Sequence, residues 1–362
     1  MRLDPLVWLL LADKQGDNRQ AQVIADLLDI PYEVRTVLPL PRYVKGKPRV
    51  RPTIAHLDLA RSDSLVAPWP DILITVGRRP NSAALWVQQQ SGGKTQLILI
   101  GRQPPDLGRY ALVISSCQYI TADDPRIIRI ALPLDDDQPP ASTQPDGFTT
   151  LLVGGPTRTF RMHPNDIDTM LTLAKQADAR NPLRVVTSRR TPKAVLDRLR
   201  TRADGGFELI EWQTKPGSDT PKYTDILARS SRFIVTGDSI SMVCDAVRTA
   251  RPVAIFILPY RYRIAEKWHQ LMLAVAGLAD GKPAGATARL LRWCADKRLF
   301  RLPRNFEAFF QYLFDHHCAS NASQGFLEHY QPIRTQDYAA IQQRLQQIIE
   351  FARDQSRPRS SK

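Results

Sequence analysis

Short apolar runs recur along the first third of the chain, and several of the segments between them repeat hydrophobic residues at helical spacing. Apolar runs of about four to eight residues predict strands, and a repeat of roughly three or four positions predicts amphipathic helices. The expected strands cover residues 6–11, 71–76, 96–100, 111–115 and 127–131. The expected helices cover residues 17–28 and 80–89. This alternation is typical of β-α-β units.

The same alternation returns in the second part of the chain. Strands are expected there at residues 148–153, 183–187, 207–211, 233–236 and 253–258, and helices at 164–176, after Thr191-Pro192 and at 239–250. Thr191-Pro192 has the residue types of a helix N-cap and first position. The rhythm ends after Tyr260, where the periodicity predicts helices at 264–276, 287–294, 306–314 and 341–351.

A linker separates the two series. Residues 135–147, DDDQPPASTQPDG, contain three prolines, four aspartates and no large apolar residue. Because parallel strands need crossover helices, we expect an α/β protein with two Rossmann-like, doubly wound parallel-sheet domains and a helical C-terminal extension. The expected boundaries are a first domain at 1–134, the linker at 135–147, a second domain at 148–260 and a mostly helical extension at 261–362.

Composition narrows the class of protein. With 362 residues, 43% of them hydrophobic and 24% charged, the chain is neither fibrous nor disordered. The longest apolar stretches, at 6–12 and 253–258, are shorter than the ~18 residues that cross a bilayer. Arg2 and the apolar run behind it could mimic a signal peptide, but no small-residue cleavage site follows. We therefore expect a cytoplasmic protein without a membrane span.

The charge favours an anionic partner. Fifty basic against 36 acidic residues give a net charge of +14, which suits nucleic acid, a phosphate-bearing small molecule or an anionic membrane face. Nucleic acid is disfavoured because no recognised binding motif accompanies the charge. The segment RYVKGKPRVR is either a plain solvated loop or a surface that attracts anionic lipid, through Arg42, Lys45, Lys47, Arg49 and Arg51.

Metal and disulfide chemistry are not indicated. Widely spaced cysteines without a CxxC pair are typical of a reducing compartment, and the chain has four, Cys117, Cys244, Cys294 and Cys318. His316-His317-Cys318 lacks a second ligand pair at zinc-finger spacing, so a surface loop is the favoured interpretation. We expect no disulfide, no metal and no bound cofactor.

Glycine, serine and arginine residues follow the expected strands, where ligands of parallel sheets bind. Glycine permits close backbone approach, helix starts present N–H groups and arginine binds phosphate, so these loops favour phosphate. The candidates in the second domain are Gly154, Gly155, Thr157, Arg158, Ser188, Arg189, Thr236, Gly237, Asp238 and Ser239. The candidates in the first domain, on the acceptor side or for phosphate, are Gly16, Arg78, Arg79 and Arg102. The GxGxxG and P-loop motifs are absent, so these loops lack the dinucleotide and P-loop fingerprints.

Five segments carry a resemblance to a known family: LADKQGDNRQ (11–20), PDILITVGRRPNSAALW (70–86), LLVGGPTRTF (151–160), VVTSRRTP (185–192) and FIVTGDSISMVCDAVRTARPV (233–253). Over about residues 5–260 the chain resembles the mitochondrial fission ELM-type family. The resemblance implies a glycosyltransferase of GT-B architecture, with a nucleotide diphosphate sugar in the second domain and a lipid-linked or cell-envelope glycan acceptor in the first. The fission role of the family implies an alternative, a non-catalytic scaffold or recruitment protein with a vestigial nucleotide-binding cleft.

Two aspartates gain roles from likeness to the peptidoglycan lipid II synthase. Asp245 falls where such enzymes place an acid on the donor ribose, and Asp17 falls near their catalytic base, although histidine stands there in the comparison enzyme. Asp17 could equally be a first-turn acid of its helix, and Asp245 a solvent-facing helix residue. The implied reaction is metal-independent and inverting, and it implies a location at the inner face of the cytoplasmic membrane.

Overall fold

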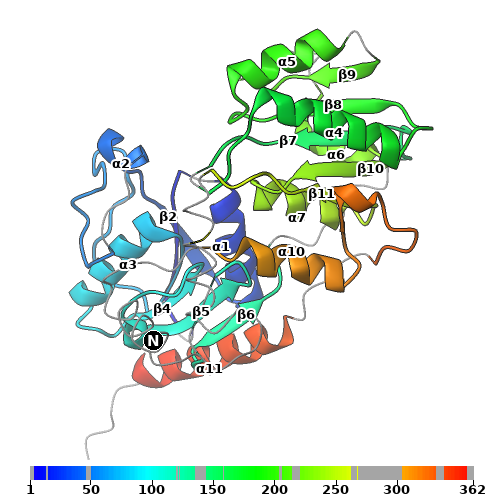
Figure 1. Cartoon of the computed structure of the whole chain (residues 1–362). Coiled ribbons are helices and arrows are strands. Elements are labelled where there is room, and N and C mark those ends of the chain that lie inside the picture. The colour runs from blue at the N-terminus through cyan, green and yellow to red at the C-terminus, as the bar shows by residue number, and fades with distance from the viewer. Residues whose placement is uncertain are drawn as a thin grey trace, which may run out of the picture. The chain divides into compact units, whose positions relative to one another are not determined.

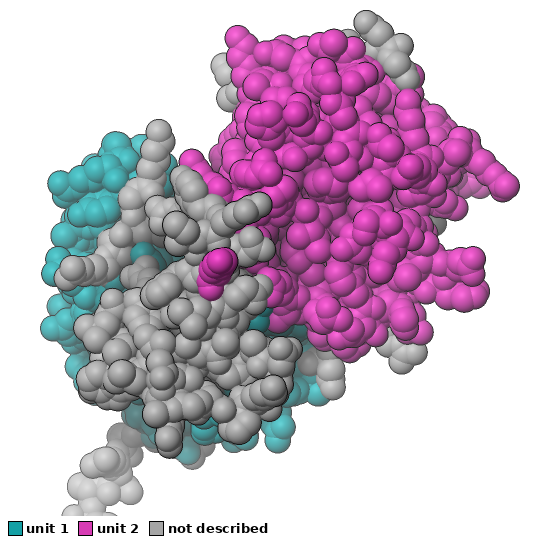
Figure 2. Space-filling view, in the orientation of Figure 1, with its two compact units in different colours: residues 1–136, 296–305, 336–362 teal, residues 137–295, 306–335 magenta. Residues whose placement is uncertain are grey.

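The computed structural model describes residues 4–13, 15–45, 50–119, 121, 123–134, 144–157, 159–203, 206–213, 221–261, 267, 304–331 and 338–356. The chain divides into two compact units, each with its own sheet (Figure 1, Figure 2). Unit 1 comprises residues 1–136, 296–305 and 336–362, and unit 2 comprises residues 137–295 and 306–335. Both units therefore contain residues from the C-terminal part of the chain.

Unit 1 contains a six-stranded parallel sheet with the order β2-β1-β3-β4-β5-β6. Its strands are β1 (Val7–Leu11), β2 (Tyr32–Thr36), β3 (Ile72–Val76), β4 (Gln96–Ile100), β5 (Tyr110–Ser116) and β6 (Ile127–Ile130). Its helices are α1 (Gln15–Leu27), α2 (Pro41–Lys45), α3 (Arg78–Gln90) and α11 (Ala339–Ser356), with a 3-10 turn at Leu107–Arg109.

Helices pack on both faces of the unit 1 sheet. Successive strand residues point to opposite faces, and apolar residues on both faces are buried by these helices. Val7 and Leu9 belong to a core that includes α1 and α11, whereas Trp8 and Leu10 belong to the core on the α3 side. Figure 1 shows α11, the last helix of the chain, beside β5 and β6. Each buried large aliphatic side chain contributes about 1.5–3 kcal/mol, so α11 supplies part of the core of a sheet built by the N-terminal sequence.

Unit 2 repeats the architecture, with the strand order β12-β11-β10-β7-β8-β9 and parallel pairing throughout. Its strands are β7 (Thr149–Val153), β8 (Leu183–Thr187), β9 (Phe207–Ile210), β10 (Arg232–Thr236), β11 (Val253–Phe256) and β12 (Ser320–Asn321). Its helices are α4 (Pro164–Ala177), α5 (Lys193–Ala203), α6 (Tyr223–Arg229), α7 (Ile240–Arg248) and α10 (Phe306–Asp315), with a 3-10 turn at Ala322–Gln324.

The predicted fold class is confirmed: two Rossmann-like parallel sheets carry flanking helices, and the C-terminal region is helical. Each of the ten predicted strands corresponds to an observed strand, whereas β2, β12, α2 and α6 were not predicted. The C-terminal region does not form a body of its own, because 306–335 belong to unit 2 and 336–362 to unit 1. The predicted helix at 287–294, most of that at 264–276 and residues 135–143 of the expected linker lie outside the described residues.

Candidate functional site

The loops after β10, β7 and β8 are neighbours in unit 2, because these three parallel strands lie side by side. The amide N–H of Gly154 donates to Oγ1 of Thr236 at 2.8 Å, and that of Gly155 donates to Oδ2 of Asp238 at 3.0 Å. The sequence-predicted residues of these loops are thus brought together, and their own side chains accept from the two glycine amides.

Glycine is required at position 154 by the closeness of this contact. A Cβ atom on Gly154 would lie 2.4 Å from both carboxylate oxygens of Asp238, far inside van der Waals contact. Asp238 therefore lies directly on the turn that follows β7. The sequence predicted that Gly154 binds phosphate, but in the structure its neighbour is the carboxylate of Asp238.

Asp238 is a buried acid with an incomplete set of partners. Its side chain is 0% exposed, and its Oδ2 forms an ion pair with Nη2 of Arg190 at 2.8 Å. Its Oδ1 has no hydrogen-bond partner within the part of the chain that the structure describes. Burial raises the pKa of Asp238 above its ordinary value of 3.8 and outweighs the opposite effects of Arg190, the Gly155 amide and Thr236.

The loop after β8 also contacts the Gly154-Gly155 turn, through hydrogen bonds to its carbonyl oxygen and through backbone contact. Ser188 and Thr191 both donate their hydroxyls to the Gly154 carbonyl, at 3.0 and 2.7 Å. A Cβ on Gly155 would lie 2.1 Å from the carbonyl oxygen of Arg190, so the two backbones touch. Thr191 was predicted to cap α5, but its hydroxyl instead bonds to the β7 turn and accepts from the Ser188 amide at 2.9 Å.

The helix that follows β10 begins at this edge. Ser239 is the N-cap residue of α7 and makes no capping hydrogen bond to it; its Oγ lies 3.3 Å from the Oγ of Ser241. Such a helix start presents N–H groups to an anion. Gly237 serves packing, since a Cβ there would meet the ring of Phe310 at 2.8 Å.

The remaining candidates of unit 2 have separate surroundings. Thr157 accepts the amides of residues 159 and 160 and so closes its own turn, while Arg189 is exposed. Asp245 lies in the middle of α7, roughly 7.5 Å along the axis from its start, and accepts from the Tyr223 hydroxyl at 3.3 Å. Arg158 lies outside the described residues.

In unit 1, the predicted residues after β1 and β3 also converge. A Cβ on Gly77 would lie 3.4 Å from Oδ2 of Asp17, so the half-buried Asp17 carboxylate lies next to the turn after β3. Gly77 has φ +79°, a conformation that favours glycine. Gly16 is exposed in the first turn of α1, and Arg78 is half-buried at the start of α3.

Arg79 forms an ion pair and hydrogen bonds within unit 1. It is 7% exposed, and its Nη2 pairs with Asp13 at 2.9 Å while Nη1 donates to the Tyr43 carbonyl at 3.4 Å. Its own carbonyl lies 2.9 Å from Nε2 of the buried His56. Arg79 therefore joins the loop after β1 to α2 and α3, and its predicted phosphate contact stays a prediction.

Arg102 lies in a cationic cluster that the sequence did not predict as a whole. The Arg102 and Arg304 guanidinium carbons lie 5.4 and 5.5 Å from the Tyr119 ring centroid. Burial lowers the pKa of Arg102; Tyr119 opposes this effect and the Arg304 charge adds to it. Arg304 was missed because it comes from a short segment, far along the sequence, that returns to unit 1.

Three further residues of the unit 2 edge were not among the predicted site residues. Arg190 and Thr191 stand in a loop that was recognised, but only Ser188 and Arg189 were selected from it. Trp212 follows β9 and is 47% exposed; its amide donates to Oγ1 of Thr187 at 2.9 Å. An aromatic residue after an apolar strand was the available signal for Trp212.

The predicted lipid-facing segment is only partly described. Arg42 and Arg51 are exposed, whereas Lys47, Arg49 and the side chain of Lys45 lie outside the described residues. No described helix is both long and apolar enough to cross a membrane. Among the described residues, no group of three or more His, Cys, Asp or Glu side chains is placed to hold a metal ion.

The comparisons with known proteins identify the family. The family model described as mitochondrial fission ELM1 matches residues 15–279. The chain belongs to this family. No curated protein matches this ELM1-family chain.

Solved structures resemble the ELM1-family chain only distantly. One is a UDP-glucosyltransferase from Polygonum tinctorium, with 11% identity, coverage of 96% of this chain and 98% of that one, and a TM-score of 0.43. Another is the S. aureus MnaA structure with UDP, with 10% identity, coverage of 86% and 95%, and a TM-score of 0.40. Likeness at this level assigns no activity.

Proposed function

We propose that this chain is a GT-B-type glycosyltransferase whose unit 2 binds a nucleotide diphosphate sugar. Membership of the ELM1 family supports the proposal, and one observation carries it. Arg190, the buried Asp238 and the start of α7 converge on a turn built from Gly154 and Gly155 at the carboxyl edge of a parallel sheet. This is the edge at which such sheets bind ligands.

Arg190 is the residue that would bind the diphosphate. Its side chain is 37% exposed, so its guanidinium can reach a ligand while it pairs with Asp238. Bidentate donation makes arginine suited to phosphate, and the first-turn N–H groups of α7 add partial positive charge. Together they would stabilise the negative charge that develops on a departing nucleoside diphosphate.

The acceptor side belongs to unit 1 in this proposal. Asp17 would act as general base on the acceptor hydroxyl in a metal-independent, inverting transfer. The family resemblance suggests a lipid-linked or cell-envelope glycan as acceptor. The exposed Arg42 and Arg51 would favour an anionic leaflet at the inner face of the cytoplasmic membrane.

One observation favours a second function, a non-catalytic scaffold with a vestigial cleft. The amides of Gly154 and Gly155 already have acceptors in Thr236 and Asp238. A turn whose N–H groups are satisfied internally needs no ligand to be stable. The two functions therefore differ in whether an anion displaces these contacts.

Titration calorimetry with UDP, GDP and ADP separates the two functions. The transferase predicts that at least one binds with a Kd below about 1 mM, and that Arg190→Ala weakens it roughly 10- to 100-fold, the range of a charged hydrogen bond. Arg198→Ala is the matched control, because Arg198 lies on α5 and pairs with Asp168 of α4. Absence of binding to the folded chain by all three would favour the scaffold.

A further inference from the structure

Arg102, Tyr119 and Arg304 form a group at the carboxyl edge of the unit 1 sheet. Arg102 follows β4 and Tyr119 follows β5, and these two parallel strands are neighbours. Arg304 belongs to the segment 296–305, which returns to unit 1 from far along the sequence. The three residues therefore come together at the edge where parallel sheets bind ligands.

Hydrogen bonds hold Arg304 and Tyr119 in this group. The amide of Asn305, which follows Arg304, donates to the carbonyl oxygen of Gln118 at 2.8 Å. Nη2 of Arg304 donates to the Tyr119 hydroxyl at 3.3 Å. The Tyr119 amide donates to the carbonyl oxygen of Ser116 at 2.9 Å and so closes the turn after β5. Side chains that are already held in place lose less freedom when a ligand binds.

The two guanidinium groups bring like charges close to each other. Their central carbons lie 5.4 and 5.5 Å from the centroid of the same Tyr119 ring. Burial lowers the pKa of Arg102, and the positive charge of Arg304 lowers it further because the two charges repel each other. An anion that contacts both guanidinium groups would offset this repulsion.

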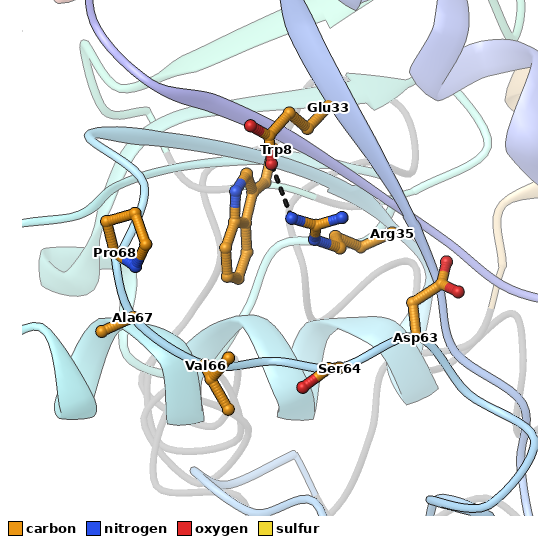
Figure 3. Close-up of a pocket in the computed structure, with 8 residues that line it drawn as sticks. All are labelled: Trp8, Glu33, Arg35, Asp63, Ser64, Val66, Ala67 and Pro68. Carbon is orange, nitrogen blue, oxygen red and sulfur yellow. Dashed lines mark hydrogen bonds and ion pairs between the residues drawn. The ribbon is translucent and has the colours of Figure 1, made fainter.

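Both arginines keep surface that a ligand can reach, since Arg304 is exposed and Arg102 is half-buried. Arg35 provides a contrast within unit 1. It also lies over an aromatic ring, 5.0 Å from the Trp8 centroid, but its Nη2 pairs with Glu33 at 2.6 Å. Figure 3 shows Arg35 beside the Trp8 ring, with this ion pair dashed. A carboxylate thus balances the charge of Arg35, whereas the Tyr119 ring has a second cation beside Arg102.

The hydrogen-bond donors of the group indicate which ligand it binds. A guanidinium group donates and never accepts, and the Tyr119 hydroxyl, which accepts from Arg304, has its own hydrogen to donate. A neutral sugar brings no charge to offset the two cations, and a carboxylate brings only one. A phosphomonoester carries about two negative charges and three acceptor oxygens, and arginine binds it in a bidentate manner. Phosphate is therefore the ligand that matches both the charge and the donors.

We propose that Arg102 and Arg304 bind the phosphate group of a phosphomonoester or a diphosphate, with the Tyr119 hydroxyl as a third donor. This phosphate site stands on the contacts given above, and only its assignment to the acceptor rests on the proposed function.

In the proposed transferase, the bound phosphate belongs to the acceptor. Asp17, the proposed base, lies next to Gly77 at the end of β3, and β3 is the neighbour of β4. The Asp17 turn is thus one to two strand spacings, about 5–10 Å, from the loops that carry Arg102 and Tyr119. One sugar residue can span this distance. The acceptor is then a sugar phosphate or sugar diphosphate, whose phosphate is held by the two arginines while a hydroxyl reaches Asp17.

Titration calorimetry tests the phosphate site in the full chain with Arg190→Ala, which weakens the proposed donor site of unit 2. The probes are sodium pyrophosphate, glucose 1-phosphate and farnesyl diphosphate, with glucose as the neutral comparison. At least one phosphate probe is expected to bind with a Kd below about 1 mM, and glucose is not. Tightest binding of farnesyl diphosphate would assign a lipid-linked phosphate, and tightest binding of either other probe a water-soluble one. Absence of binding by all three to the folded chain would overturn the proposal.

Further variants place the binding at the two arginines. Arg102→Ala and Arg304→Ala are each expected to weaken the bound phosphate probe about tenfold, the equivalent of one charged hydrogen bond. Arg35→Ala is the matched control, because Arg35 is also a half-buried arginine of unit 1 over an aromatic ring. If Arg102→Ala does not fold, Arg304→Ala decides alone, since Arg304 is exposed. Unchanged affinity in the folded variants, or an equal loss in Arg35→Ala, would sink the proposal.

Nucleotide binding separates this inference from the proposed function. With Arg190 intact, neither Arg102→Ala nor Arg304→Ala should change the affinity for a nucleotide. A chain that binds no nucleotide but loses the phosphate probe in these variants would refute the transferase and keep the phosphate site. Nucleotide binding that depends on Arg190, with no effect of Arg102 or Arg304 on the phosphate probes, would keep the transferase and remove the phosphate site.

Discussion

Replacing Gly154 with alanine perturbs the unit 2 turn at one atom. The added Cβ would lie 2.4 Å from both oxygens of Asp238, about 1 Å inside the 3.4 Å at which ordinary contact begins. The carboxylate must then move, and it would lose the Gly155 amide at 3.0 Å and the Arg190 guanidinium at 2.8 Å. Gly154→Ala is therefore expected to reveal how much Asp238 contributes to the turn.

The expected magnitude follows from burial. Asp238 is fully buried, whereas Arg190 is 37% exposed and recovers water when the pair breaks, so the cost lies at the low end for a buried pair. We expect Gly154→Ala to lower the free energy of unfolding of unit 2 by about 2–3 kcal/mol. In the Asp238→Ala background the clash is gone, and the same substitution should cost less than about 1 kcal/mol. The coupling energy is then roughly 2 kcal/mol.

Native-state hydrogen exchange provides the assay, because the amides of β7 and β10 report the opening of unit 2 alone. The four chains of the cycle are the wild type, the two single variants and the double variant. Gly108→Ala in unit 1 is the control, since a Cβ there meets only ordinary contacts at 3.6 and 3.7 Å. If Gly154→Ala costs the same with and without the Asp238 carboxylate, the turn is not built as described and the reasoning fails.

Other predictions address protonation and catalysis. Because the folded pKa of Asp238 is raised, its protonated form stabilises the fold below pH 3.8, and this stability is lost as pH rises through the folded pKa. In urea titrations, the free energy of unfolding of Asp238→Asn should therefore increase relative to that of the wild type as pH rises over this range. Burial raises the pKa of Tyr110 to about 12, so its stability contribution should be lost between pH 10 and 12. Tyr110→Phe removes the hydroxyl that donates to the buried Asn81 Oδ1 at 2.9 Å and leaves that oxygen without this donor. It should lower the free energy of unfolding, measured by thermal unfolding, by about 1–2 kcal/mol. Asp17→Asn should lower kcat about 100-fold in donor turnover and leave nucleotide affinity unchanged; full turnover would show that Asp17 is only a helix-start residue.

The strands were predictable where burial is complete. β3 (ILITV) and β7 (TTLLV) are buried at every position, and such runs of aliphatic residues and threonine predict strands in an alternating β-α sequence. β2 (Tyr32–Thr36) was missed because it is an edge strand, YEVRT, with charged residues at alternate positions and Val34 44% exposed. An edge strand needs no apolar run, so its sequence resembles a loop.

The loops of the candidate site were predictable, but which residue of each loop contacts the glycine turn was not. Strand ends fixed the position of Ser188 to Thr191, since ligand loops follow parallel strands. Which of two successive arginines turns toward the glycine turn depends on the loop conformation, and in the structure it is Arg190 that pairs with Asp238. Arg304 could not be assigned from sequence, because nothing local shows that residues 296–305 return to unit 1.

The Gly154-Gly155 turn shows why residue type alone left the ligand open. A glycine turn with inward N–H groups attracts negative oxygen whether that oxygen belongs to phosphate or to the chain. A buried N–H without an acceptor would cost about 1–3 kcal/mol. In the chain without ligand, Asp238 supplies the acceptor oxygen to the Gly155 amide, although the two residues are more than 80 positions apart in the sequence. Donor binding in the proposed transferase is therefore an exchange in which phosphate competes with the Asp238 carboxylate for the Gly155 amide. Because burial already favours protonation of that carboxylate, the exchange should become easier as pH falls toward the folded pKa of Asp238.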